Sequence, residues 1–157
     1  QRYASLLSHH IWQPLGCAHD AYVTVDAEGT ARSAGGICIH PHDLVRLGLA
    51  LIEADSECSE HALSHRWIHD TFNEGNQTAW QRGEFSALLP SGNYRNQWYR
   101  TQAKGGALLA IGIHGQWLYA DPLNQVVIAK LSSQPQPVND AQDVQLINDF
   151  QKLAEAL

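Results

Sequence analysis

The sequence predicts a chain of the mixed α/β (strictly α+β) class, in which an antiparallel sheet packs against helices. Three observations support this prediction. Apolar residues recur every three or four positions in the N-terminal half, short strand-like runs replace that spacing from about residue 94, and residues 139–157 return to it. A length of 157 residues and a hydrophobic content of 44% suffice for a single globular core.

The chain opens with a predicted helix and strand. The helical spacing over residues 3–15 is stopped by a proline and a following glycine, and alternation over residues 22–25 predicts one strand.

Two more helices are predicted before the sheet. Pro41 is placed to begin a helix with a broad apolar face, and Gly48 beside that face indicates close packing. A second helix is expected from Ser59, as its N-cap, to about Phe72. Residues 73–84 have the polarity of a loop.

The C-terminal half has the signature of an antiparallel meander. Its runs YRNQWYRTQ, GALLAIGI, QWLYAD and QVVIAKLSS are expected to form short strands or strand segments, with a tight turn at DPLN before the last. Asn139 or Asp140 can then cap a final helix. Its predicted buried stripe consists of Val144, Ile147, Phe150, Leu153 and Leu157.

Composition narrows the function classes. The net charge is −6 and no basic stripe is present, which argues against nucleic acid as a partner. No run approaches the roughly 18 apolar residues of a membrane helix, and no signal peptide opens the chain, so no membrane partner is expected. The widely spaced Cys17, Cys38 and Cys58 indicate buried thiols and favour a cytoplasmic location.

Two glycines suggest a site. Residues 107–134 have for the most part the pattern of two buried strands joined by a proline turn, with Gly112 and Gly115 bracketing Ile113 and His114 inside the first. Because glycine packs no side chain, strand interiors disfavour it, and the pair indicates a place where another group approaches the backbone closely. The alternative is a bulge with His114 as a hydrogen-bonded core residue.

Three stretches together carry a family resemblance: DAYVTVDAEG, SAGGICIHPHDLVRLG and GIHGQW. They resemble 6-aminohexanoate-dimer hydrolases and related class-C-like serine hydrolases. The closing strands and final helix are similar to the C-terminal part of the β-lactamase and transpeptidase fold. The resemblance implies that residues 1–157 form the C-terminal segment of a single β-lactamase-like domain. The start at Gln1 and the absence of methionine favour the same expectation of a longer polypeptide.

The resemblance further implies hydrolysis of a small-molecule amide or ester through an acyl-enzyme, with no cofactor. The front half of that family carries a Ser-x-x-Lys nucleophile motif and a catalytic tyrosine. The three lysines of this chain, Lys104, Lys130 and Lys152, have no serine three positions before them. We therefore expect the N-terminal part of the same protein, or another chain, to supply the nucleophile, and this chain alone to be inactive.

The same resemblance assigns an electrostatic role to this segment. A strand at the edge of the family's cleft offers a backbone N–H to the developing oxyanion, and one such donor contributes about 3 kcal/mol. By resemblance the donor is Ile113, with Gly112 keeping the strand accessible. Residues 110–112 replace the usual Lys-Thr-Gly in this register, and residues 114–116 replace it in a second one.

The substrate-binding candidates surround that strand. His114 and Gly115 follow from the second register. Tyr22 lies where related hydrolases place a strand near the cleft, and its phenol could hydrogen-bond an amide. Trp98 and Tyr99 precede the glycine-marked strand at a distance that suits a wall of the same cleft. The alternative for all three aromatic residues is packing in the core.

Histidine supports a competing hypothesis. His61, His65 and His69 recur every four residues on one helical face, with Cys58 about one turn before them, and zinc or copper accepts such ligands. Three histidines in a row span about 12 Å at the helical rise, so only a pair could bind one ion, and a solvated or packed face is preferred. A weak metal-binding domain and a non-catalytic binding or structural module remain the alternatives to a hydrolase.

Overall fold

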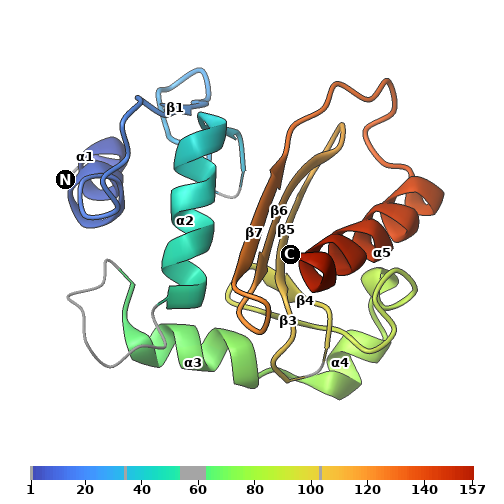
Figure 1. Cartoon of the computed structure of the whole chain (residues 1–157). Helices are drawn as coiled ribbons and strands as arrows, with labels where there is room; N and C mark the ends of the chain where they lie inside the picture. The colour runs from blue at the N-terminus through green and yellow to red at the C-terminus, as the bar shows by residue number, and fades with distance from the viewer. Residues whose placement is uncertain (1, 34, 54–62, 103) are drawn as a thin grey trace.

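The computed structural model describes residues 2–33, 35–53, 63–102 and 104–157. Figure 1 shows its elements. In chain order these are α1 (Tyr3–Leu7), the π-helical turn η1 (Ser8–Trp12), β1 (Tyr22–Val23), β2 (Ile37–Cys38), α2 (Pro41–Glu53), α3 (His65–Asn73), α4 (Gln77–Gln81), the 3-10 turn η2 (Glu84–Ser86), β3 (Asn93–Arg95), β4 (Trp98–Arg100), β5 (Leu108–Gly112), β6 (Gln116–Asp121), β7 (Val126–Lys130) and α5 (Asp140–Ala156).

The main sheet is a five-stranded antiparallel meander in the order β3-β4-β5-β6-β7. Its strands are rich in aromatic and β-branched residues, which fit a pleated surface covered on both sides. In Figure 1, α2 lies against one face of the sheet and α5 against the other. The predicted meander and mixed class are thereby confirmed.

Neighbouring residues of β5 enter separate cores, because side chains alternate across a strand. Leu108 packs with Leu51 and Ile52 of α2, together with residues of α3. Leu109 packs in the second core, which contains Ile147 and Phe150 of α5. Both leucines have no exposed surface, and burying each contributes about 1.5–3 kcal/mol.

Close contact between α2 and the sheet depends on Gly48. A Cβ atom added there would lie 2.4 Å from Cγ1 of Val127 and 3.2 Å from Cδ1 of Leu118. Any larger residue would therefore push α2 away from β6 and β7. The close packing predicted at Gly48 is confirmed.

Two predictions between α2 and the sheet were wrong. Helix α3 begins at His65, not Ser59, because Ser64 has extended backbone and its side chain caps the amide of Trp67. Residues 59–62 of that prediction lie outside the described residues. The predicted loop contains α4, whose first turn is capped by the side chain of Asn76.

Hydrogen bonds tie the C-terminal end of α3 to the sheet. Arg100 is fully buried and donates to the carbonyl oxygens of Phe72 and Glu74. Arg95 donates two bonds of 2.7 Å to the carboxylate of Asp70. These bonds, with one from Asn96, lower the pKa of Asp70 to about 2.

The final helix is capped by Asn139 as predicted, with its side chain accepting from the amide of Gln142. Its buried apolar residues are Ile147, Phe150 and Ala154. The predicted stripe was wrong at its ends, where Val144, Leu153 and Leu157 are exposed. Residues spaced three apart drift by about 60° per step around a helix, so only the middle of the stripe faces the sheet.

The cysteine prediction also needs correction. Cys38 is exposed and Cys17 only half-buried, while Cys58 lies outside the described residues. Among the helices that the structure describes, none combines the length and the apolar character required to cross a lipid bilayer.

Candidate functional site

Gly112 and Gly115 do not lie inside a strand, so that part of the sequence interpretation was wrong. Gly112 ends β5 and pairs with Gln116, the first residue of β6. Residues 113–115 form the turn between these strands. His114 and Gly115 both have positive φ angles, of 60° and 79°, which explains the glycine at the second position.

His114 anchors this turn to the segment that leads into α5. Its amide donates to the carbonyl of Pro137 at 3.0 Å, and its own carbonyl accepts from the amide of Gln134 at 3.2 Å. Its ring Nδ1 lies 2.8 Å from the carbonyl oxygen of Gln134, an acceptor, so this nitrogen carries the proton. These bonds fix the turn, and the proposed substrate contact of His114 stays a prediction.

Ile113 directly follows β5, at an end of that strand that β4 does not cover. The amide of Thr101 donates to the carbonyl of Ala107 at 3.0 Å. Because hydrogen-bonding positions alternate in an antiparallel pair, the odd-numbered residues of β5 point toward the β4 side. The β4–β5 register ends at Tyr99 and Leu109. No described strand residue is therefore paired with Ile111 or Ile113 on that side.

A cavity of about 480 Å³ lies beside this turn. Gly112, Ile113 and Gly115 line it from the turn, and further lining residues come from residues 84–88 and from the start of α5. The side chain of Ile113 is 64% exposed. Three of the residues singled out from the sequence thus border one hollow of the size that small-molecule sites have.

The predicted aromatic residues do not share this cavity. Trp98 lines a hollow with residues of α1 and α2, whereas Tyr99 lines one with Trp80 and Phe85. The rings of Phe85 and Tyr99 have centroids 4.7 Å apart and planes inclined by 32°, and Phe85 also borders the cavity at Ile113. Tyr99 therefore contacts a residue of that cavity without lining it. Tyr22 is 72% exposed on β1 and lines none of these three hollows.

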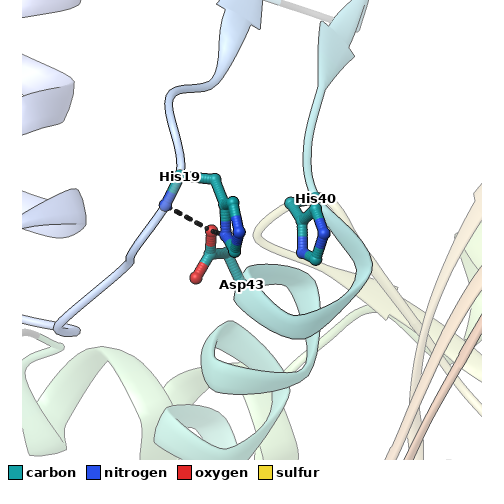
Figure 2. Close-up of side chains that lie close together, drawn as sticks. All are labelled: His19, His40 and Asp43. Carbon is teal, nitrogen blue, oxygen red and sulfur yellow. Dashed lines mark hydrogen bonds and ion pairs between the residues drawn. The ribbon is translucent and has the colours of Figure 1, made fainter.

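Figure 2 shows a second polar cluster, formed by His19, His40 and Asp43 at the start of α2. Asp43 has no exposed surface. One carboxylate oxygen accepts from the amide of Ala18 and the guanidinium of Arg46, and the other from the amide and ring Nδ1 of His19. Burial alone would raise the pKa of Asp43, but these hydrogen bonds hold it well below its usual range.

The arrangement of His19, His40 and Asp43 brings possible metal ligands close together. One ligand atom from each of His19, His40 and Asp43 lies within 4.8 Å of the others. However, the two imidazoles are stacked, with centroids 3.7 Å apart and planes inclined by 14°. A bound ion lies in the plane of each ring that ligates it, and two nearly parallel planes do not meet between the rings. Asp43 also has all its acceptor positions filled. The cluster therefore anchors residues 18–19 to α2 and does not fit a metal ion as arranged.

The helical histidines proposed from the sequence are only partly described. His65 and His69 lie one turn apart on α3. Cys58 and His61 lie outside the described residues, so the metal hypothesis for this face stays a prediction.

Sequence reasoning missed the burial of two carboxylates on helices, Asp43 and Asp143. Each lies in the first turn of a helix, where acidic residues are common for reasons of helix stability. Asp143 is 8% exposed and lines the cavity at Ile113. Nothing in the local sequence distinguishes these two from an ordinary exposed acid, because their burial is created by segments distant in the chain.

A known protein structure has the same arrangement of helices and strands as this chain. No family model matches the chain. The structure superposes on a Bacillus anthracis protein assigned as a 6-aminohexanoate-dimer hydrolase, with a TM-score of 0.76 and 26% identity, over 96% of this chain and 37% of that one. The antiparallel meander between α2 and α5 is thus part of a β-lactamase-like fold.

Comparison of sequences finds a relative that carries the same name as the structural one. The chain is 35% identical over 136 residues to the 6-aminohexanoate-dimer hydrolase of Paenarthrobacter ureafaciens, which covers 87% of this chain and 35% of that protein. The resemblance to 6-aminohexanoate-dimer hydrolases found in the sequence is confirmed, and the chain is similar to part of these longer proteins. The chain spans about a third of the length of these relatives.

Proposed function

We propose that this chain is the part of an amide hydrolase that binds the oxyanion during acyl transfer to a serine supplied by the rest of the protein. The observation that carries the proposal is the position of Ile113, which directly follows the end of β5 that β4 leaves uncovered and which lines a cavity. The relatives support it, because their name describes hydrolysis of a dimer of 6-aminohexanoate, which is a linear aliphatic amide. The proposed substrates are small molecules of this class or the corresponding esters.

The role of Ile113 in this mechanism is electrostatic. Attack on the carbonyl carbon of the amide places negative charge on its oxygen, and a preorganised N–H stabilises that charge without reorganising at the moment of reaction. The turn is preorganised because hydrogen bonds from the amide, the carbonyl and the ring of His114 join it to residues 134–137. No cofactor is required for this step.

The nucleophile, its lysine and the catalytic tyrosine are proposed to come from the N-terminal part of the same protein. The Ser-x-x-Lys motif is absent from the sequence. Strand β7 is a suitable place for that part to join, because among the described strands it pairs with β6 alone. Its five residues are half-buried between α2 and α5 and mostly apolar, which is typical of an internal strand and not of an edge.

A fluorophosphonate probe tests the acyl-transfer proposal. Covalent labelling is expected for the protein that includes the N-terminal part and not for residues 1–157 alone. Labelling of neither form would favour a non-catalytic binding or structural module.

Ile113→Pro tests the oxyanion role, because proline removes the N–H while the exposed side chain has little packing to lose. We expect kcat to fall about 100- to 1,000-fold with little change in KM. Ile113→Val, which keeps the amide, is the matched control. Equal kcat values for the two variants would exclude Ile113 as the donor.

A further inference from the structure

The side chain of Gln116 bridges the turn at Ile113 and the segment that follows β7. Its Oε1 accepts from the amide of Ser132 at 3.3 Å, and its Nε2 donates to the carbonyl oxygen of the same residue. The Nε2 also donates to the carbonyl oxygen of His114 at 3.2 Å. The carboxamide uses its acceptor and its donors together, so it bonds to Ser132 as a backbone peptide of a neighbouring strand would.

This side chain extends the bonding between β6 and β7 beyond their last backbone pair. The register of the two strands ends at Lys130, whose ammonium group donates to the carbonyl oxygen of Gly115 at 3.1 Å. Further along, His114 is bonded to residues 134–137. Gln116 thus connects the regular ladder with the bonds that hold His114.

The two glycines of the site make room for glutamine side chains. Gly112 pairs with Gln116, and a Cβ atom added to Gly112 would lie 3.0 Å from Cβ of Gln116. A Cβ atom added to Gly115 would lie 2.6 Å from Cδ of Gln134, whose carbonyl oxygen bonds the ring of His114. A side chain at either glycine would push a glutamine away from the turn.

The turn depends on these bonds because its backbone conformation is unfavourable. His114 has a φ of 60°, which is uncommon for a residue with a Cβ atom and persists only where the surrounding structure determines it. Ile113 directly precedes it, and its side chain is 64% exposed, so side-chain packing contributes little to holding the backbone there. The position of the Ile113 backbone therefore depends on the hydrogen bonds of its neighbours.

We propose that Gln116 is a positioning residue, which fixes the turn and thereby orients the oxyanion donor proposed at Ile113. The inference rests on the proposed function and adds to it a residue that acts through another. Gln116 is not among the residues that line the cavity at Ile113. Loss of its carboxamide should therefore slow the chemical step and leave substrate binding nearly unchanged.

Kinetics of the intact protein, N-terminal part included, test this with p-nitrophenyl butyrate as the ester probe. Gln116→Leu removes all three bonds, and we expect kcat to fall about tenfold or more with little change in KM. In the Ile113→Pro background the same substitution should lower kcat no further, because no donor is left to orient. Gln145→Leu is the matched control, because Gln145 is exposed on α5 and its side chain donates to that of Asp149.

Two kinetic outcomes would overturn the proposal. The first is an equal kcat for Gln116→Leu and Gln145→Leu. The second is a fall caused by Gln116→Leu that is as large in the Ile113→Pro background as in the parent, because Gln116 would then act independently of the Ile113 amide.

Amide hydrogen exchange, resolved by NMR, tests the positioning without any turnover. Gln116→Leu should accelerate exchange about tenfold or more at the amides of His114 and Ser132, which donate to Pro137 and to Gln116 itself. Gln116→Glu keeps an acceptor for Ser132 and loses the N–H donors. The amide of Ser132 should then stay better protected than in Gln116→Leu, whereas that of His114 exchanges faster than in the parent. Parent-like protection of His114 in both variants would show that the turn is fixed without Gln116.

The two proposals fail separately. A full-length protein that neither hydrolyses the ester nor reacts with the fluorophosphonate would refute acyl transfer, and with it the donor that Gln116 is proposed to orient. If instead Ile113→Pro lowers kcat and Gln116→Leu does not, the oxyanion role of Ile113 stands and the role of Gln116 is refuted.

Discussion

The first turns of α2 and α5 each contain a buried carboxylate, but the two differ in their partners and in the direction of their pKa shifts. Asp43 on α2 receives hydrogen bonds from Ala18, His19 and Arg46, and its pKa is lowered. Asp143 on α5 forms no ion pair with a cation in the part of the chain that the structure describes; it lines a cavity, and burial raises its pKa. The difference shows that burial alone does not define a functional acid. The first carboxylate stabilises the fold through its partners, whereas burial of the second disfavours its charged form.

The largest effect is expected from Asp43→Ala. It would leave the amides of Ala18 and His19 without their acceptor and Arg46 without its counter-charge, so Tm should fall by about 10 °C. Differential scanning calorimetry measures this, with Asp20→Ala as an exposed control. A Tm equal to that of the control would contradict the anchoring role.

Substitutions in α2, where it packs closely on the sheet, should cost more stability than substitutions in α5 where it borders the cavity. Gly48→Ala forces a Cβ against Val127 and should cost about 1–3 kcal/mol of unfolding free energy, measured by urea denaturation. Val144→Ala at the cavity should change it by about 0.5 kcal/mol or less, since Val144 is 43% exposed. A Gly48→Ala, Val127→Ala double variant should recover part of the loss. No recovery would mean that the contact with Val127 is not the cause.

Asp143→Asn should keep the unfolding free energy within about 1 kcal/mol of the parent, or raise it slightly, because it removes a buried charge that no described residue pairs with in an ion pair. Urea denaturation at pH 7 checks this. A clear loss of stability would show that Asp143 supports the fold in the way that Asp43 does.

The two carboxylates should also give opposite pH dependences. The lowered pKa of Asp43 makes its stabilisation complete above about pH 4 and lost as the pH falls through the lowered value. The raised pKa of Asp143 makes the protein less stable as the pH rises through about 4 toward the raised value. The parent and Asp143→Asn should therefore converge in unfolding free energy below pH 4. Parallel curves from pH 3 to 7 would contradict the shift at Asp143.

The smallest effect is expected at Asp70, whose pKa of about 2 reflects an ion pair on the surface with Arg95. Its contribution is present above about pH 4 and disappears as the pH falls through 2. Asp70→Asn should lower the stability only slightly at neutral pH, and less at high salt, because exposed pairs are screened. An effect as large as that of Asp43→Ala would require a role beyond this pair.

Some elements could be predicted because their signals are local. Pro41 and the apolar spacing that follows it specify α2, and the turn at Asp121 is specified by its carboxylate accepting from the amides of Leu123 and Asn124. The start of α3 was misplaced because Ser59 and Ser64 offer the same capping chemistry. Gly112 and Gly115 were assigned to a strand interior because a turn and a bulge require the same residues.

The amino-acid sequence by itself determined the mixed class, the antiparallel meander, the capped final helix and the family resemblance, because hydrophobic period, turn chemistry and short motifs are properties of neighbouring residues. Only the tertiary structure decided which acids are buried, which of them have partners, and that Ile113 borders a cavity shared with α5. Burial and charge pairing depend on segments far apart in the chain. Residues 84–88, the turn at Ile113 and the start of α5 meet only once the sheet has formed.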